Sequence, residues 1–176
     1  LDVGAGVVEK LVSEAKSRKG IVAFHHSENC REEIDPVLKL EPNFLVHLCN
    51  AKEEDLVKIK AQEVGVVVCP RSNARFGLRA PLERMLELGI DVGLGTDNGM
   101  FTSLNMIEEL RFAAREFSSI APVELIRLVC FGLDRTIGKF SEVVSQDGGY
   151  VIMEETEENP EMAALDSKSE ILEVIW

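Results

Sequence analysis

Four short, continuous apolar segments recur in the first hundred residues of this chain, at 21–24, 44–48, 64–69 and 90–95. An unbroken apolar run of this length is typical of a strand whose two faces are both buried, as in a parallel sheet. The segments begin 20 to 26 residues apart, and the intervals between them carry helical patterns. The repeat therefore predicts an α/β fold built on a parallel sheet.

The segments around these strands have the features of helices. Residues 4–18 place apolar side chains along one helical stripe, and residues 51–63 open with three acidic residues, which suits the positive end of a helix dipole. Proline in the first turn and glycine after the last turn mark a further helix. The predicted helices are 4–18, 51–63, 80–88, 104–117 and 122–133.

The C-terminal region has a different pattern. Two strand-like segments, 148–155 and 170–176, are separated by an acidic stretch that contains a proline. We therefore expect two units: residues 1–141 form the α/β part, and residues 142–176 form part of a small β element.

Charge and composition exclude several classes of partner. The formal net charge is −12, which argues against nucleic acid and against an anionic membrane surface. No apolar run is long enough to cross a bilayer, and no secretory signal is recognisable. The four cysteines are widely spaced and form no Cys-x-x-Cys pair, which is typical of free thiols in a reducing compartment. These features predict a cytoplasmic protein that binds neither nucleic acid nor a membrane. The net charge leaves a small-molecule substrate open, because a local site can carry either sign.

Polar side chains follow each of the four predicted strands at its carboxyl end. His25 and Glu28 follow the first strand, His47 ends the second, Asn73 lies just past the third, and Asp97 follows the fourth. In parallel α/β folds the chemistry collects at this edge of the sheet. Two imidazoles and an aspartate could form much of a catalytic zinc or iron site, and a nearby glutamate could carry protons.

Simpler interpretations exist for some of these residues. His26 is expected to be a hydrogen-bonded core residue, because the pleat of a strand turns its side chain away from that of His25. Asp97 could merely cap the helix that follows it. Residues Cys69 and Pro70 could simply end their strand.

Three stretches resemble a known group of enzymes, the amidohydrolase superfamily. "HHSEN" resembles its strand-five motif His-x-Ser/Ala-Glu, and "FLVHLCNAKEEDL" resembles its strand-six histidine motif. "VGVVVCPRSNARFGLRAPLERMLELGIDVGLGTDNGMFTSLNMIEELRFA" is similar to the branch that holds cytosine, guanine and S-adenosylhomocysteine deaminases and chlorohydrolases. The resemblance is collinear over residues 20–118.

The resemblance implies a fold and a set of roles. The fold would be the C-terminal half of a TIM-type (β/α)8 barrel, with strands equivalent to five to eight, followed by part of a small β-sandwich. His25 and Asp97 would bind a divalent metal, zinc or else iron. Glu28, His47 and Asp97 would be catalytic, and the reaction would be hydrolysis of a C–N bond, the deamination of a nucleobase- or nucleoside-like heterocycle. Asn73 is expected to help shape the rim.

One family motif is missing from the sequence. The superfamily's first strand carries His-x-His, which supplies two further metal ligands, and this chain has no such motif. Four strands cannot close a barrel that needs eight. A catalytically incomplete half-barrel, acting as a structural or binding module, is therefore the alternative to an enzyme.

An incomplete barrel would also leave one face of its sheet uncovered. We expect that face to include several of Val22, Phe24, Leu45, Val67 and Leu94. Exposed edges and apolar patches of this kind drive association. The chain is therefore expected to form a homo-oligomer or to associate with a missing N-terminal half.

Overall fold

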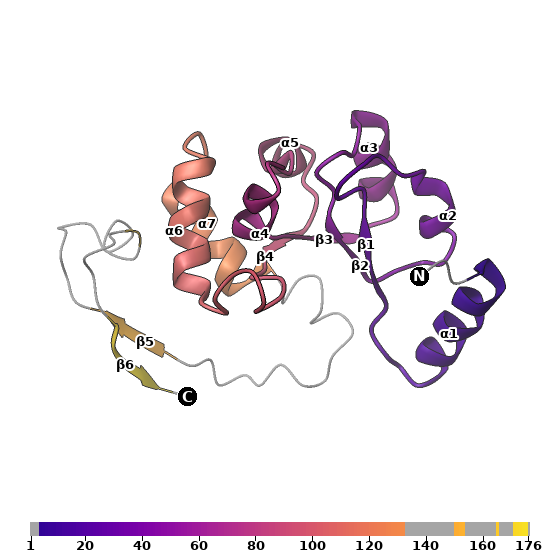
Figure 1. Ribbon diagram of the computed structural model, residues 1–176, viewed down its shortest axis with the longest axis horizontal. Coiled ribbons are helices and arrows are strands. Elements are labelled where there is room, and N and C mark those ends of the chain that lie inside the picture. The colour runs from indigo at the N-terminus through magenta and orange to yellow at the C-terminus, as the bar shows by residue number, and fades with distance from the viewer. Residues whose placement is uncertain (1–3, 133–149, 154–164, 166–170, 176) are drawn as a thin grey trace.

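The fold is known from a computed structural model that describes residues 4–132, 150–153, 165 and 171–175 (Figure 1). Its elements follow the predicted βα order. The α/β class and the parallel sheet are confirmed.

The central sheet has four parallel strands in the order β1-β2-β3-β4. Each strand pairs with the next one along the chain, and in this register His26 lies beside His47 and Val46 beside Val67. All four carboxyl ends therefore lie at one edge of the sheet, as predicted. The strands are β1 (Ala23–His26), β2 (Phe44–His47), β3 (Gly65–Val68) and β4 (Val92–Leu94).

Seven helices precede, connect and follow these strands within the described residues. The five predicted helices are present, each shorter than expected by a few residues at its ends. The two short helices, α2 and α4, were not predicted, because one or two turns are too few to show an apolar stripe. The helices are α1 (Ala5–Ser17), α2 (Ile34–Leu38), α3 (Glu53–Ala61), α4 (Pro70–Arg75), α5 (Leu82–Glu87), α6 (Met106–Glu116) and α7 (Pro122–Cys130).

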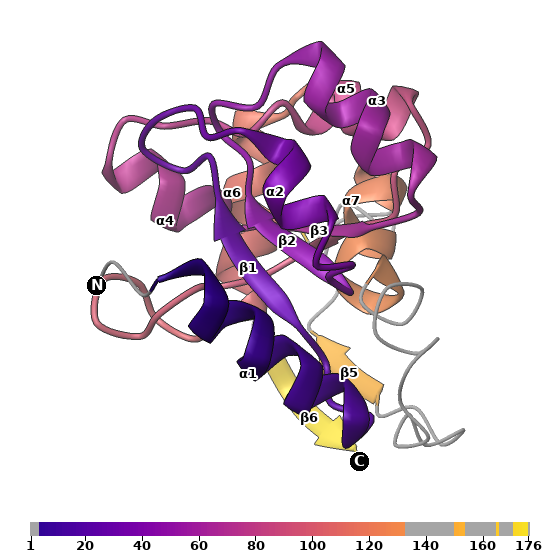
Figure 2. The same ribbon diagram turned by 90° about the vertical axis from the view of Figure 1, so that its right-hand side faces the viewer.

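The main hydrophobic core lies between one face of the sheet and the helices α2, α3, α5, α6 and α7. Leu45, Val66 and Leu94 contribute the strand side of this core and are fully buried. Figure 2 shows α2 next to β1 and β2, with α3 farther toward the upper right of the view. The helices therefore pack on the face of the sheet that carries Leu45, Val66 and Leu94.

A second, small cluster lies on the other face, because successive strand residues point to opposite sides. Within the described residues it consists of Val46, Val67 and Cys69, with Phe44 partly buried against it. The sequence-based expectation for this face was right for Val67. It was wrong for Leu45 and Leu94, and for Phe24, which packs against the main core. A continuous apolar run does not reveal which alternate residues face the helices.

The C-terminal residues form a separate two-stranded sheet. Strands β5 (Tyr150–Met153) and β6 (Ile171–Ile175) pair in antiparallel fashion, as the two strand-like segments predicted. The expected boundary between residues 141 and 142 lies outside the described residues. In the described part of the chain, the helices are all too short or too polar to span a bilayer.

Candidate active site

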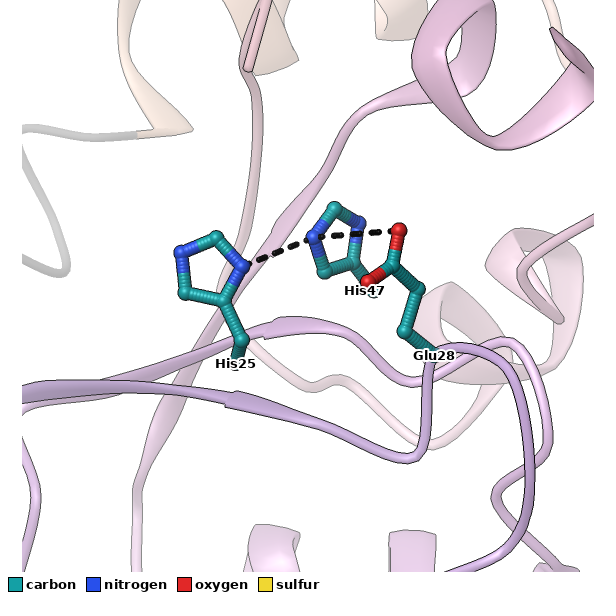
Figure 3. Close-up of side chains that lie close together, drawn as sticks. All are labelled: His25, Glu28 and His47. Atoms are coloured by element: carbon teal, nitrogen blue, oxygen red, sulfur yellow. Dashed lines mark hydrogen bonds and ion pairs between the residues drawn. The ribbon is translucent and has the colours of Figure 1, made fainter. Parts of the chain in front are cut away.

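Three of the predicted site residues meet at the carboxyl ends of β1 and β2 (Figure 3). His25 Nδ1 and His47 Nε2 are 3.0 Å apart, and Glu28 Oε1 is 3.8 Å from the same His47 nitrogen. One potential ligand atom from each residue lies within 4.8 Å of the other two. The pattern of strand ends therefore located a real cluster of two imidazoles and a carboxylate.

The loop after β1 holds Glu28 in this cluster. Glu32 closes the turn, because its carboxylate accepts a hydrogen bond from the backbone N–H of Ser27 at 2.6 Å. Ser27 has a left-handed backbone, with φ of 48°. On the far side of the loop, the Asn50 amide donates to the carbonyl of Glu28 at 2.5 Å. The Glu28 side chain stays partly exposed at 25%, so its carboxylate can reach a small molecule.

His47 is the buried member of the cluster, with 1% of its surface exposed. Its backbone is left-handed, with φ of 75°, and on the ring's other side Nδ1 is 2.9 Å from the Asn73 amide nitrogen. Burial lowers the pKa of the His47 imidazole, and this effect outweighs the opposing attraction of the Glu28 carboxylate. His47 is therefore poised to act as a neutral imidazole.

His26 does not join the cluster. Its ring nitrogens lie 3.0 Å from the Ser27 hydroxyl and 3.3 Å from the carbonyl oxygen of Glu33. The side chain is buried, with 7% exposed. His26 is a hydrogen-bonded core residue, as the pleat of the strand predicted.

Asp97 follows β4 and lies outside the group formed by His25, Glu28 and His47. Its Oδ2 accepts a hydrogen bond from the Ser72 hydroxyl at 2.5 Å, and its backbone is left-handed, with φ of 59°. Asp97 does not cap the next helix: the residue at that position is Asn105, whose side chain accepts from the N–H groups of Ile107 and Glu108. The capping interpretation of Asp97 is therefore wrong.

The short helix α4 connects the two halves of this edge. Its consecutive residues Ser72 and Asn73 contact Asp97 and His47 respectively. The sequence drew attention to Asn73 but gave no role to Ser72. The sequence signal that could have indicated α4 was Cys69-Pro70, because proline favours the first position of a helix. This pair starts α4 and does not merely end β3.

Glu109 of α6 is a functional candidate that sequence reasoning missed. It is fully buried, and its Oε1 accepts from the backbone N–H of Arg71 at 2.8 Å. Burial raises the pKa of this carboxyl, although Arg71 partly opposes the shift. A glutamate inside an amphipathic helix reads as a surface residue, so only the fold shows that it points inward.

The whole α/β part of the chain matches a known protein family. Residues 8–142 fit the model of the amidohydrolase family. This chain belongs to the amidohydrolase family.

Relatives and solved structures agree with this membership. A 5-methylthioadenosine/S-adenosylhomocysteine deaminase of Carboxydothermus hydrogenoformans is 35% identical over 96 residues, which are 52% of this chain and 22% of that protein. An adenosine deaminase from Xanthomonas campestris with bound zinc superposes with a TM-score of 0.67 at 21% identity, over 77% of this chain and 36% of that one. The guanine deaminase of C. acetobutylicum superposes with a TM-score of 0.66 at 19% identity, over 76% and 39%.

These similarities also define how much of an amidohydrolase is present. The chain spans between 33% and 42% of the length of three curated relatives that it matches. The chain likewise covers 36% and 39% of the two similar solved structures. The four described strands therefore correspond to part of a barrel, as the count of strands predicted.

The donor set of this amidohydrolase edge fits a divalent metal. Imidazole nitrogens and carboxylate oxygens are ligands that zinc and iron both accept. His25, Glu28 and His47 present such atoms close together. Asp97 is linked to this group through helix α4, whose residues Ser72 and Asn73 contact Asp97 and His47. Two different ligand sets can thus be drawn from these residues: the cluster itself, or the pair His25 and Asp97 that the resemblance implies.

Proposed function

We propose that this chain supplies half of the active site of a metal-dependent hydrolase that deaminates a heterocyclic, nucleobase- or nucleoside-like substrate. The observation that carries the proposal is the meeting of His25, Glu28 and His47 at the carboxyl edge of the sheet in an amidohydrolase. The names of the relatives support a deaminase, because several are 5-methylthioadenosine/S-adenosylhomocysteine deaminases.

Each site residue has a distinct proposed role. Glu28 takes a proton from the attacking water and delivers it to the ring nitrogen or the leaving amine of the substrate. His47, a neutral ring buried beside Glu28, hydrogen-bonds the substrate or the attacking oxygen. Asp97 accepts the other proton of this water and returns it to whichever of the ring nitrogen and the leaving amine Glu28 does not protonate, so both protons of the water end on the products. The carboxylates suit this work because general acid–base groups must sit within reach of the atoms between which protons move.

His25 and Asp97 would hold the metal, with further ligands supplied from outside this chain. A bound zinc or iron ion lowers the pKa of water toward neutrality, which is the chemistry that deamination requires. Zinc and iron both accept this mixed set of nitrogen and oxygen donors, and zinc is the preferred candidate. The Xanthomonas campestris adenosine deaminase with bound zinc supports that choice.

A set of substitutions separates this arrangement from the alternative ligand set. In the full-length protein, His25→Ala and Asp97→Asn should each lower metal content sharply, whereas Glu28→Gln should leave it near the wild-type level. Metal content is measured by elemental analysis, and deamination by ammonia release from a panel of nucleobases and nucleosides. Loss of metal in Glu28→Gln with retention in Asp97→Asn would instead assign the metal to the cluster of His25, Glu28 and His47.

The working unit is proposed to be larger than this chain. A catalytic zinc normally has three protein ligands, and the proposed pair His25 and Asp97 supplies two. Association with the remaining barrel strands, or with a second copy, would complete the site and cover the face that carries Val46 and Val67. Light scattering of the purified chain should show an assembly; a monomer that deaminates by itself would refute this.

The proposed location is the cytoplasm. All four cysteines are free thiols in the structure. Burial raises the pKa of the Cys49 thiol to about 11, which keeps it protonated and unreactive.

A further inference from the structure

The short helix α4 holds two polar side chains that face the candidate active site. Ser72 and Asn73 are each 1% exposed. The Ser72 hydroxyl donates to Asp97 Oδ2 at 2.5 Å, and the Asn73 amide nitrogen donates to His47 Nδ1 at 2.9 Å. Consecutive residues of one helix therefore contact two site residues that belong to different strand ends.

The Asn73 contact matches one of the two neutral tautomers of His47. An amide N–H can only donate, so the ring nitrogen that accepts from it must be unprotonated. The proton of the neutral ring then sits on Nε2, the nitrogen that faces His25 at 3.0 Å and Glu28 at 3.8 Å. His47 thus presents a hydrogen-bond donor to the site.

Asn73 is a costly residue for its position. Its Oδ1 is buried and has no hydrogen-bond partner among the described residues. Leaving a buried acceptor unsatisfied is destabilising, so an apolar residue of similar size would suit the packing better. The hydrogen bond from the Asn73 amide nitrogen to His47 Nδ1 accounts for an amide at this position.

Ser72 acts in a similar way on Asp97. Its hydroxyl takes one of the two carboxylate oxygens, Oδ2, and so fixes the rotation of the carboxylate about its terminal bond. Asp97 needs this support because its backbone is left-handed, with φ of 59°, a conformation that must be held by its surroundings.

The rest of the α4 region is fastened independently of the site. Glu109 accepts from the backbone N–H of Arg71 in the first turn of α4. The Arg71 guanidinium donates to the carbonyl and hydroxyl oxygens of Ser103, at 3.2 and 3.0 Å. The helix is therefore anchored to α6 and to the loop after β4, which gives Ser72 and Asn73 a rigid base.

We infer that α4 is a positioning element in which Asn73 sets the tautomer and orientation of His47 and Ser72 sets the orientation of Asp97. The inference rests on the proposed function only for what His47 and Asp97 then do. Outer partners of this kind typically change metal affinity or activity by about 10–100-fold when they are removed.

The test for Asn73 reads the His47 ring directly. In the chain labelled with 15N at histidine, two-bond proton–nitrogen spectra distinguish a protonated from an unprotonated ring nitrogen. At a pH above the ordinary imidazole pKa, wild-type His47 should show its proton on Nε2. Asn73→Leu should give a mixture of tautomers, and the isosteric Asn73→Asp, an acceptor, should move the proton to Nδ1.

A matched control removes a similar amide at the other end of the same sheet. Asn43 Oδ1 accepts from the backbone N–H of Val22 at 2.7 Å, so Asn43→Leu should lower stability and leave the His47 spectrum unchanged. An unaltered His47 spectrum in Asn73→Asp would overturn the role of Asn73. This readout needs neither metal nor turnover. The role of Asn73 can therefore be refuted while the proposed deaminase activity stands, and the activity can be refuted while the role of Asn73 stands.

The test for Ser72 uses zinc affinity. Competition with a chromophoric chelator should show Ser72→Ala binding zinc about 10–100-fold more weakly than the wild type, with Ser72→Thr restoring affinity because it keeps the hydroxyl. If Asp97→Asn weakens zinc binding, equal affinities in these three proteins would overturn the role of Ser72. If Asp97→Asn binds zinc as tightly as the wild type, it is instead the proposed ligand role of Asp97 that fails. Ser17→Ala, which removes a hydroxyl that donates to the carbonyl of Glu14 in α1, is the control and should change affinity little.

Discussion

The two faces of the four-stranded sheet differ in what they contribute to the molecule. One face is covered by five helices and forms the main core, with Leu45, Val66 and Leu94 at its base. The other carries the small cluster of Val46, Val67 and Cys69, and His25 lies exposed on β1 beside Val46. Stability and chemistry are thus divided between the faces of the same short strands.

This division shows why the chain can keep a folded core while holding only part of a site. The helix-covered face needs no other strands to bury its side chains, because its helices come from the same stretch of sequence. In the proposed function, groups from elsewhere would cover the open face and complete the ligand set at the edge above it. Substitutions should therefore separate into those that affect folding and those that affect chemistry.

The largest expected effect belongs to Glu28 at the carboxyl edge. Glu28→Gln keeps the size of the side chain but removes its ability to accept a proton. In the full-length protein, turnover should fall about 10²–10⁴-fold, while the midpoint of thermal unfolding should match the wild type. Kinetics and calorimetry on the same preparation provide the measurement, and a large loss of stability would show that Glu28 has a structural role.

The next largest effect is expected on the helix-covered face, at Gly132 just after α7. A Cβ there would overlap the carbonyl oxygen of Val92 and lie 2.8 Å from Gly93 Cα, and these backbone atoms of β4 are held in place by its pairing with β3. Gly132→Ala should lower the free energy of unfolding by about 3 kcal/mol, measured by urea denaturation.

Gly6 of α1 is the control for this prediction. An added Cβ at Gly6 meets no described atom within 4 Å. Gly6→Ala should therefore raise stability by up to about 1 kcal/mol, because alanine favours a helix more than glycine does. Equal effects of the two substitutions would contradict the close approach of Gly132 to β4.

A smaller and sharper comparison uses two neighbouring valines of β3. Val66 is 0% exposed on the helix-covered face, and Val67 is 8% exposed on the other. Val66→Ala should cost about 2–3 kcal/mol, from lost burial plus a cavity. Val67→Ala should cost about 1 kcal/mol in the isolated chain, where its neighbours can relax. Equal losses would mean that the second face is as tightly packed as the first.

Much of this structure could be predicted from the sequence. The strands were recognisable because parallel strands are apolar throughout, and the edge that carries the chemistry followed from their common direction. His25, Glu28 and His47 were found in this way, and the structure brings them together. The assignment of Asp97 as a metal ligand stays a prediction.

Other features depend on contacts that no local pattern contains. Leu45 and Leu94 were assigned to the wrong face, because an unbroken apolar run looks the same from both sides. The short helix α4 and the bond from Ser72 to Asp97 arise from the packing of β3 against β4 and α6. Glu109 was missed because its burial is a property of the fold and leaves no mark on the helix pattern.

The left-handed backbones at His47 and Asp97 have a consequence for how the protein responds to heat. Glycine provides this conformation at Gly77 and Gly89, whereas the two site residues hold it with φ of 75° and 59°, as do surface residues such as Lys19 and Glu41. Holding such residues there costs about 1–2 kcal/mol each, supplied by the surrounding packing. On warming, these two positions should relax before the core melts. Activity should then disappear a few degrees below the loss of helical signal, and it should return on cooling.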